Sequence, residues 1–352
     1  MIREYPELAQ ARKDMLGQSA LYRPTMFWDA ASTKIVTEIC EHGVENFRQL
    51  SKSLSFFVPT YGPPANSLSR AQVEALEHGF DAENPKARKQ QMTLRYLLGG
   101  EASALADYRV LLAGDTQEAL PKLHIFSECS YGNPSERFEF AGRFFSRSAL
   151  NYLLGLAFLK KHLNGDVLRT VIEVGGGFGT LGEVLAAGGI DGLRYVNLDI
   201  PPTSFIAQCY LTAALGAEHL STYAGTRGRK EIQISSLRRA SVLCCWQIEN
   251  LQGKADLFVN FISFQEMEPP VVQNYLHHVD RLQTRYVLLR NLREGKAVKS
   301  EEVKYGVEVP TKGEDYDRYL ENYNLIAINV HPFGHRTVDG FHSELRLYKR
   351  RG

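Results

Sequence analysis

The stretch Val-Ile-Glu-Val-Gly-Gly-Gly-Phe-Gly-Thr-Leu-Gly, residues 171–182, constrains the fold of this chain more than any other. Its first residues are apolar and mostly β-branched, which predicts a buried parallel strand. Glycines follow, and the apolar residues of 181–185 then recur at helical spacing. A strand, a tight glycine turn and a helix make the first half of a nucleotide-binding βαβ unit. Side chains at Gly175 or Gly177 would fill the space that a ligand needs.

Two classes of cofactor use such a turn. A dinucleotide fingerprint, counted from Gly175, needs its third small residue at Thr180, so the match is imperfect. The other class carries an acid two residues before the first glycine, here Glu173, which suits the amino group of S-adenosylmethionine. Asp199 ends the second predicted strand, where it can accept the ribose hydroxyls in either class or cap the next helix. The pattern favours S-adenosylmethionine over NAD, and a glycine turn without a ligand is the alternative.

Composition excludes several classes of function. The chain has 352 residues, 44% of them hydrophobic, which is enough for two domains. With 41 basic and 40 acidic side chains, it offers no electrostatic basis for binding nucleic acid or an anionic membrane. The five cysteines are scattered, which predicts reduced thiols and no zinc site. No signal peptide or membrane span is expected, so we predict a cytoplasmic protein.

The predicted elements divide the chain into two parts. Residues 1–165 are mainly helical, with a proline-containing loop at 56–68, and could serve as a lid, a dimer surface or a substrate region. Residues 166–352 alternate strands and helices, which is typical of a doubly wound, mostly parallel sheet. We expect its later parallel strands at 194–199, 240–246, 256–261 and 286–290, and a terminal antiparallel hairpin at 325–330 and 344–348.

Several short motifs carry a resemblance to a known family. These are Gly-Asn-Pro at 132–134, the glycine turn at 171–180, Asn-Leu-Asp-Ile-Pro-Pro at 197–202 and Asn-Phe-Ile-Ser-Phe-Gln-Glu-Met at 260–267. Together they resemble a bacterial family of sugar O-methyltransferases, from about residue 120 to the C-terminus. The resemblance implies a Rossmann-like class I methyltransferase fold, S-adenosylmethionine as cofactor, and methyl transfer to a sugar hydroxyl of a glycoside or natural product.

Candidate site residues follow from the strand ends and from the chemistry of methyl transfer. A sugar hydroxyl is a poor nucleophile, so a base should take its proton. Of the bases at the cofactor edge, we predict Glu266 and His335 as catalytic, while His342 and His331 are weaker candidates. For Glu266, a helix cap or a pair with Arg290 is the structural alternative. The predicted cofactor-binding residues are Glu173, Gly175, Gly176, Gly177, Phe178, Asp199, Ile200, Trp246, Gln247, Asn260 and Phe261. The predicted acceptor-binding residues are Tyr131, Asn133, Arg290, Asn291 and His342.

Other interpretations of the sequence stay open. The same cofactor could serve methylation of a peptide, a polyketide or an amine. An NAD-dependent oxidoreductase is disfavoured by Thr180 and Glu173, and a fold that only binds is disfavoured by the intact glycine turn and acids. We expect no metal, because the acids Asp199, Glu266 and Asp339 are dispersed in role. A homodimer is compatible with the helical N-terminal part.

Overall fold

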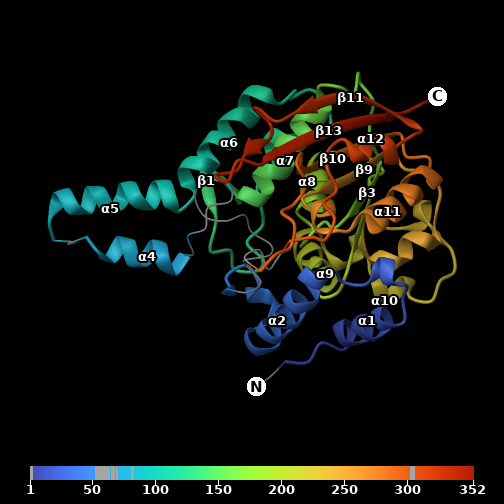
Figure 1. Cartoon of the computed structure of the whole chain (residues 1–352), viewed down its shortest axis with the longest axis horizontal. Helices are drawn as coiled ribbons and strands as arrows, with labels where there is room; N and C mark the ends of the chain where they lie inside the picture. The colour runs from blue at the N-terminus through green and yellow to red at the C-terminus, as the bar shows by residue number, and fades with distance from the viewer. Residues whose placement is uncertain (1–2, 52–63, 65–67, 69, 81–82, 302–305) are drawn as a thin grey trace.

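The computed structural model describes residues 3–51, 64, 68, 70–80, 83–301 and 306–352 (Figure 1). The loop predicted at 56–68 therefore lies outside the described residues, apart from residues 64 and 68. None of the described helices combines the length and the apolar character that crossing a membrane requires.

Nine strands of the described chain form one sheet in the order β11-β13-β10-β9-β3-β4-β7-β5, with β12 beside β13. The strands from β3 to β10 in this sheet run parallel, while β13 runs antiparallel to both β10 and β11. This confirms the predicted α/β fold, a mostly parallel sheet that ends in an antiparallel hairpin. The strands are β3 (Thr170–Val174), β4 (Arg194–Asp199), β5 (Leu220–Ser221), β7 (Ala240–Cys244), β9 (Leu257–Phe261), β10 (Tyr286–Leu292), β11 (Tyr323–Asn329), β12 (His335–Arg336) and β13 (His342–Arg350).

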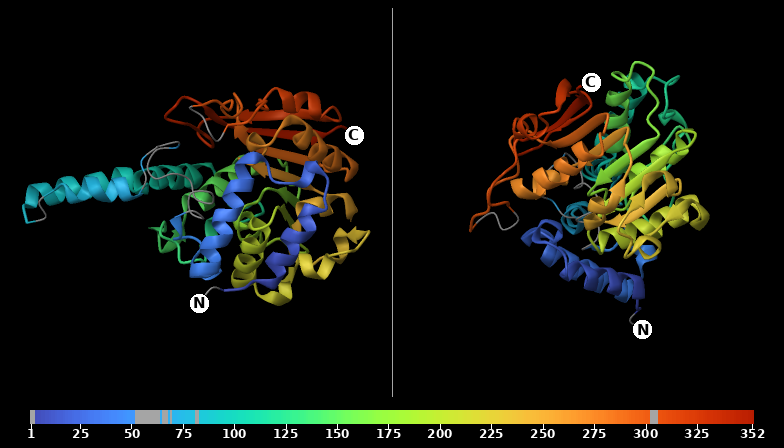
Figure 2. Two further views of the ribbon diagram at one scale, coloured as in Figure 1. Left: turned by 60° about the horizontal axis from the view of Figure 1, so that its bottom comes forward. Right: turned by 90° about the vertical axis from the view of Figure 1, so that its right-hand side faces the viewer.

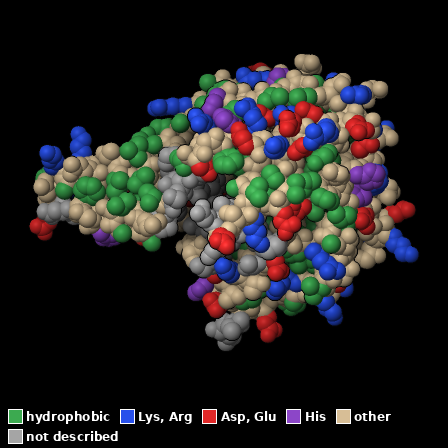
Figure 3. All heavy atoms as spheres, viewed as in Figure 1, with side chains coloured by type: hydrophobic (Ala, Val, Ile, Leu, Met, Phe, Trp, Pro, Cys, Tyr) green, Lys and Arg blue, Asp and Glu red, His purple; other side chains and the backbone are tan. Residues whose placement is uncertain are grey.

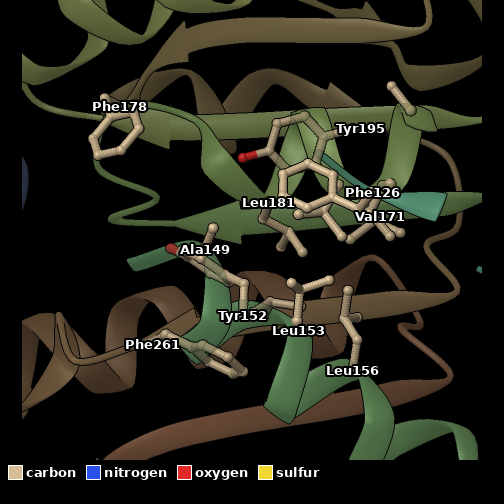
Figure 4. Packing of buried hydrophobic residues seen from close by; sticks show 14 of the residues in the cluster. Phe126, Ala149, Tyr152, Leu153, Leu156, Val171, Phe178, Leu181, Tyr195 and Phe261 are labelled. Atoms are coloured by element: carbon tan, nitrogen blue, oxygen red, sulfur yellow. The ribbon is translucent and has the colours of Figure 1, made fainter. Parts of the chain in front are cut away.

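Helices cover both faces of the sheet, so side chains of one strand alternate between two cores (Figures 1 and 2). Val171 of β3 packs into the core that includes α7, α8 and α9, and Figure 4 shows part of this packing. The next residue, Ile172, packs into the opposite core with α11. Burial on both faces explains the nearly continuous apolar run of this strand. The helices around the sheet are α7 (Arg147–Lys160), α8 (Thr180–Ala187), α9 (Thr203–Leu215), α10 (Tyr223–Thr226), α11 (Pro269–Arg281) and α12 (Asp315–Tyr319).

The N-terminal part supplies α1 (Pro6–Leu16), α2 (Met26–His42), α4 (Arg70–His78), α5 (Pro85–Leu98) and α6 (Glu101–Gly114). In Figure 1, α1 and α2 lie on the side of the body opposite the C-terminal strands, and α4 and α5 project as an arm. Helix α5 buries none of its residues, and hydrophobic side chains are visible along the arm in Figure 3. A hairpin of β1 (Phe138–Phe140) and β2 (Arg143–Phe145) then leads into α7.

One boundary differs from the predicted one, and one helix cap is well defined; both matter for the site. The strand predicted at 240–246 ends at Cys244, and a 3₁₀-helix over Cys245–Asn250 follows. Helix α7 starts at Arg147 because the Ser146 hydroxyl accepts a hydrogen bond from the Ala149 N–H and caps it. The remaining short elements are the pair β6 (Ile232–Gln233) and β8 (Leu251–Gln252) and 3₁₀-helices at Ala20–Tyr22, Val44–Asn46, Leu123–Ile125, Ala217–His219, Ile234–Ser236 and Phe264–Glu266.

Candidate active site

A cavity of about 780 Å³ lies at the carboxyl ends of β3, β4 and β9, where Val174, Asp199 and Phe261 line it. This is the edge at which open α/β sheets bind ligands. Residues of α2, α6 and α7 line the same cavity, so the N-terminal part forms one of its walls.

The glycine turn forms the part of the cavity next to β3. Gly175 and Gly177 have positive φ angles of 69° and 57°, which residues other than glycine adopt only with strain. A Cβ atom on Gly175 would collide with the Ser263 side chain, and one on Gly176 would lie 2.5 Å from a Glu173 carboxylate oxygen. A Cβ atom on Gly177 would meet no atom within 4 Å, so this glycine faces open space. The turn is thus tightly packed against the protein at Gly175 and Gly176 and open to the cavity at Gly177.

Asp199 borders the open side of the turn. Its carboxylate accepts hydrogen bonds from the Gly177 N–H at 3.1 Å and the Ile200 N–H at 2.7 Å. Burial raises the pKa of Asp199 to about 8, although both backbone donors act in the opposite direction. Asp199 lines the cavity, as its predicted role requires.

Glu173 lies behind the glycines and does not line the cavity. It is fully buried, and one carboxylate oxygen accepts a hydrogen bond of 2.5 Å from the Tyr195 hydroxyl. The other oxygen has no partner among the described residues. Burial raises the pKa of Glu173 to about 7, and the Tyr195 and Tyr152 hydroxyls oppose this rise. Because it does not reach the cavity, Glu173 would act on a bound ligand mainly through the electrostatic field of its ionised form.

The other predicted cofactor residues fall into two groups. Those at the cavity are Gly175, Gly176, Gly177, Phe178, Ile200 and Phe261. Trp246, Gln247 and Asn260 are buried outside it. Because β7 ends at Cys244, Trp246 packs against Tyr223, and the Gln247 side chain accepts from the Cys244 N–H. Asn260 donates to the Val174 carbonyl and accepts from the Phe264 N–H, which fixes the end of β9.

None of the five predicted acceptor residues lines the cavity. Tyr131 packs against the core, and Asn133 donates to the Asn46 side chain at 2.5 Å. Asn291 accepts from the Gln265 N–H, and His342 pairs with Glu294 at 2.6 Å. These four side chains therefore serve local structure where they stand.

Arg290, the fifth, acts on the cavity through a neighbour. Its buried guanidinium donates to the Asn151 side-chain oxygen and to the Phe333 carbonyl, and it lies 5.1 Å from the Phe261 ring centre. Burial lowers the pKa of Arg290 to about 10. Since a guanidinium only donates, it must meet the oxygen of Asn151, so it fixes the orientation of an amide that lines the cavity.

Both predicted bases line the cavity. Glu266 accepts from the Lys296 ammonium at 2.7 Å and from the Trp28 indole N–H at 3.1 Å, so its cation is Lys296 and not Arg290. His335 has its pKa lowered to about 3, first by burial and then by Arg290 and Arg147. It is therefore a neutral imidazole at physiological pH.

Several residues of the cavity were not predicted from the sequence. Ser103 and Asp107 come from α6, Arg147, Ser148 and Asn151 from α7, and Thr337 follows β12. The available signal was in α7, where Arg147 and Asn151 are spaced by one helical turn in a mostly apolar helix. Within the described ranges, no three His, Cys, Asp or Glu side chains are grouped as a metal site would need.

Comparisons with known proteins give only distant likenesses. No family model and no curated protein matches this chain. Among solved structures, magnesium protoporphyrin IX methyltransferase from Synechocystis PCC 6803 with bound SAM is 14% identical, over 58% of this chain and 81% of that one, with a TM-score of 0.38. The mitomycin 7-O-methyltransferase MmcR is 15% identical over 96% of this chain and 79% of its own, with a TM-score of 0.37. Such values assign no activity to this chain.

Proposed function

We propose that this chain is an S-adenosylmethionine-dependent O-methyltransferase that acts on a sugar hydroxyl of a glycoside or natural product. The observation that carries the proposal is the glycine turn, where Gly177 opens without obstruction onto a cavity that Asp199 borders. The cofactor supplies an electrophilic methyl group on a sulfonium ion.

The charges around the turn suit a cationic cofactor. Gly175, Gly176 and Gly177 would contact it through their backbone, and Asp199 and Ile200 would flank its ribose. Glu173 and Asp199 bring two buried carboxyls to this end. Burial raises the pKa of both, and a bound sulfonium and ammonium group would favour their ionised forms. A pyrophosphate, as in NAD, would meet unfavourable charge there. The fit therefore favours S-adenosylmethionine.

The α6–α7 end, defined here by Ser103, Asp107, Arg147, Ser148, Asn151 and Thr337, suits an acceptor rich in hydroxyls. Its side chains offer a carboxylate, a guanidinium, an amide and three hydroxyls within one cavity. Each sugar hydroxyl is both a donor and an acceptor, so such a mixed set can satisfy it. An apolar acceptor would leave the Asp107 carboxylate, which has no hydrogen-bond partner among the described residues, without one, at a cost of about 1–3 kcal/mol if it stays buried.

The chain must orient the two reactants and manage one proton. Reacting atoms need to approach to about 3–3.5 Å and in line, which the walls of the cavity can enforce. The acceptor hydroxyl must lose its proton as the new bond forms. Of the two bases predicted from the sequence, Glu266 is neutralised by Lys296, and His335 lies near two guanidinium groups that disfavour its protonation.

Thermal unfolding with S-adenosylhomocysteine, NAD and NADP tests the cofactor. At about a hundredfold excess over Kd, the ligand that fits should raise the unfolding free energy by ~2.7 kcal/mol. We expect this with S-adenosylhomocysteine alone. Stabilisation by NAD or NADP alone would refute the proposal.

Transfer of labelled methyl from S-adenosylmethionine to the methyl pyranosides of glucose, galactose, mannose and rhamnose tests the acceptor class. Methyl ethers of at least one of them are expected.

A homodimer also remains a prediction, for which the exposed Leu76, Met92 and Leu97 of the arm are the expected contact residues. Sedimentation of the wild type and of a Met92→Glu variant would check it.

A further inference from the structure

Three carboxylates line the cavity, and they differ in what engages them. Asp199 accepts two backbone N–H groups at the glycine turn. Glu266 is engaged on both oxygens, by Lys296 and by Trp28. Both carboxylates are therefore already engaged by groups of the protein, Asp199 at the glycine turn and Glu266 in the cavity wall.

Asp107 is different. It lies on α6 at the α6–α7 end, and in the part of the chain that the structure describes it makes no hydrogen bond or ion pair. Helix α6 packs on α7, which carries Arg147 and Asn151 to the same end of the cavity. A partly exposed carboxylate without a partner can accept a hydrogen bond from a ligand hydroxyl at no structural cost.

The charges around Asp107 also suit proton transfer. Arg147 of α7 and Arg290 of β10 favour its ionised form, but burial outweighs them and raises the pKa of Asp107 above its ordinary value. A carboxylate with a raised pKa is a stronger base than an exposed aspartate. The same two arginines lower the pKa of His335, which would have to become a third cation to act as the base.

We propose that Asp107 is the general base, which takes the proton from the acceptor hydroxyl as its oxygen is methylated. The inference rests on the proposed function. The proton passes from the acceptor oxygen to a carboxylate oxygen of Asp107, the methyl carbon leaves sulfur for the acceptor oxygen, and sulfur keeps the electron pair. Asp107 then releases one proton to water for each methyl ether formed.

Glu266 takes a positioning role in this scheme. Its two contacts join Trp28 of α2 to Lys296, which follows β10, across one wall of the cavity. Removing its charge should loosen that wall while leaving the proton acceptor intact. The two acids can therefore be separated by experiment.

The test compares Asp107→Asn and Asp107→Ser with Glu266→Gln, using the four methyl pyranosides as acceptors. Methyl transfer should fall about 10²-fold or more in both Asp107 variants, the usual contribution of a general base. The fall should be clearly smaller in Glu266→Gln. Wild-type turnover should rise with pH as Asp107 ionises, and this rise should be smaller in the Asp107→Asn variant, which keeps only the contribution of Glu173 and Asp199 at the other end.

A second readout does not depend on turnover. Saturation-transfer NMR of the methyl pyranosides with the S-adenosylhomocysteine complex should show contact in wild type and in Asp107→Asn, because the amide still binds a hydroxyl. Turnover that survives in both Asp107 variants, or a loss in Glu266→Gln that equals theirs, would overturn the assignment. A wild type that binds S-adenosylhomocysteine but methylates none of the glycosides would overturn the proposed function, and the assignment with it.

Discussion

The two ends of the cavity are built in opposite ways. The glycine-turn end is made of backbone, with Asp199 held by two N–H groups of nearby residues. The α6–α7 end is made of side chains from separate helices and from the residue after β12. The shape of the turn itself is set by consecutive residues, to which only Asp199 and Ile200 are added from β4, while the shape of the other end exists only after the helices have packed. This contrast predicts that variants at one end should affect the cofactor and variants at the other end the acceptor.

The largest effect on ligand binding is expected from Gly177→Ala. The new methyl group would project into the open space in front of the turn and should weaken S-adenosylhomocysteine binding by about a hundredfold, or ~2.7 kcal/mol, measured by calorimetry. Gly142→Ala is the matched control, because that glycine also has a positive φ and open space around it, in the β1–β2 hairpin. Both variants should lose about 1–2 kcal/mol of unfolding free energy from left-handed backbone. Equal S-adenosylhomocysteine affinity in the two would contradict the placement of the cofactor.

Glu173→Gln should separate stability from binding. The folded pKa of about 7 lies above the ordinary 4.5, so the folded protein holds a proton that the unfolded chain releases, and stability is lost as pH rises between these values. Removing the charge should therefore stabilise the free protein by up to roughly 3 kcal/mol near pH 8.5. The same change should weaken the binding of S-adenosylmethionine, which has a sulfonium ion, more than the binding of S-adenosylhomocysteine, whose sulfur is uncharged. Denaturation and calorimetry at about pH 5.5 and 8.5 would check both, and a variant less stable at the higher pH would exclude this explanation.

Asn151→Ala is expected to act at the other end. It removes an amide from the cavity and leaves the buried Arg290 without one acceptor, at a cost of about 1–3 kcal/mol of unfolding free energy. Glycoside contact in saturation-transfer spectra should weaken, whereas S-adenosylhomocysteine affinity should hold. A parallel loss of both ligands would mean that the two ends are not independent.

The smallest effect is expected from Lys296→Met. Its ion pair with Glu266 is largely shielded from solvent but lies at the edge of the cavity, so we expect a change of only about 1 kcal/mol in stability. Stopped-flow measurement should show faster release of S-adenosylhomocysteine, because one wall has lost a contact. An unchanged rate of S-adenosylhomocysteine release would mean that the Lys296–Glu266 contact does not hold the cofactor in place.

The contrast also explains what the sequence could predict. The glycine turn, Asp199 and the antiparallel end of the sheet depend on local patterns of glycine, β-branched and acidic residues, and each was found where it was predicted. Trp246 and Gln247 were placed at a strand tip, but β7 ends two residues earlier, and Cys245 lines the cavity in their stead.

Asp107 could not be found from local patterns. Its place at the same end of the cavity as Arg147 depends on how α6 packs on α7, which no spacing within α6 encodes. Arg290 was predicted to bind the acceptor, but its guanidinium donates to the Asn151 side chain and the Phe333 carbonyl, and it does not line the cavity. Predicting such residues requires the tertiary arrangement first.

The contact between Trp28 and Glu266 also gives the protein an intrinsic fluorescence probe at the cavity. The chain has only two tryptophans, and the second, Trp246, packs against Tyr223 away from the cavity. A Trp246→Phe variant would leave one indole, hydrogen-bonded to an acid of the cavity wall. Its emission should then report the filling of the cavity in real time, without any attached dye.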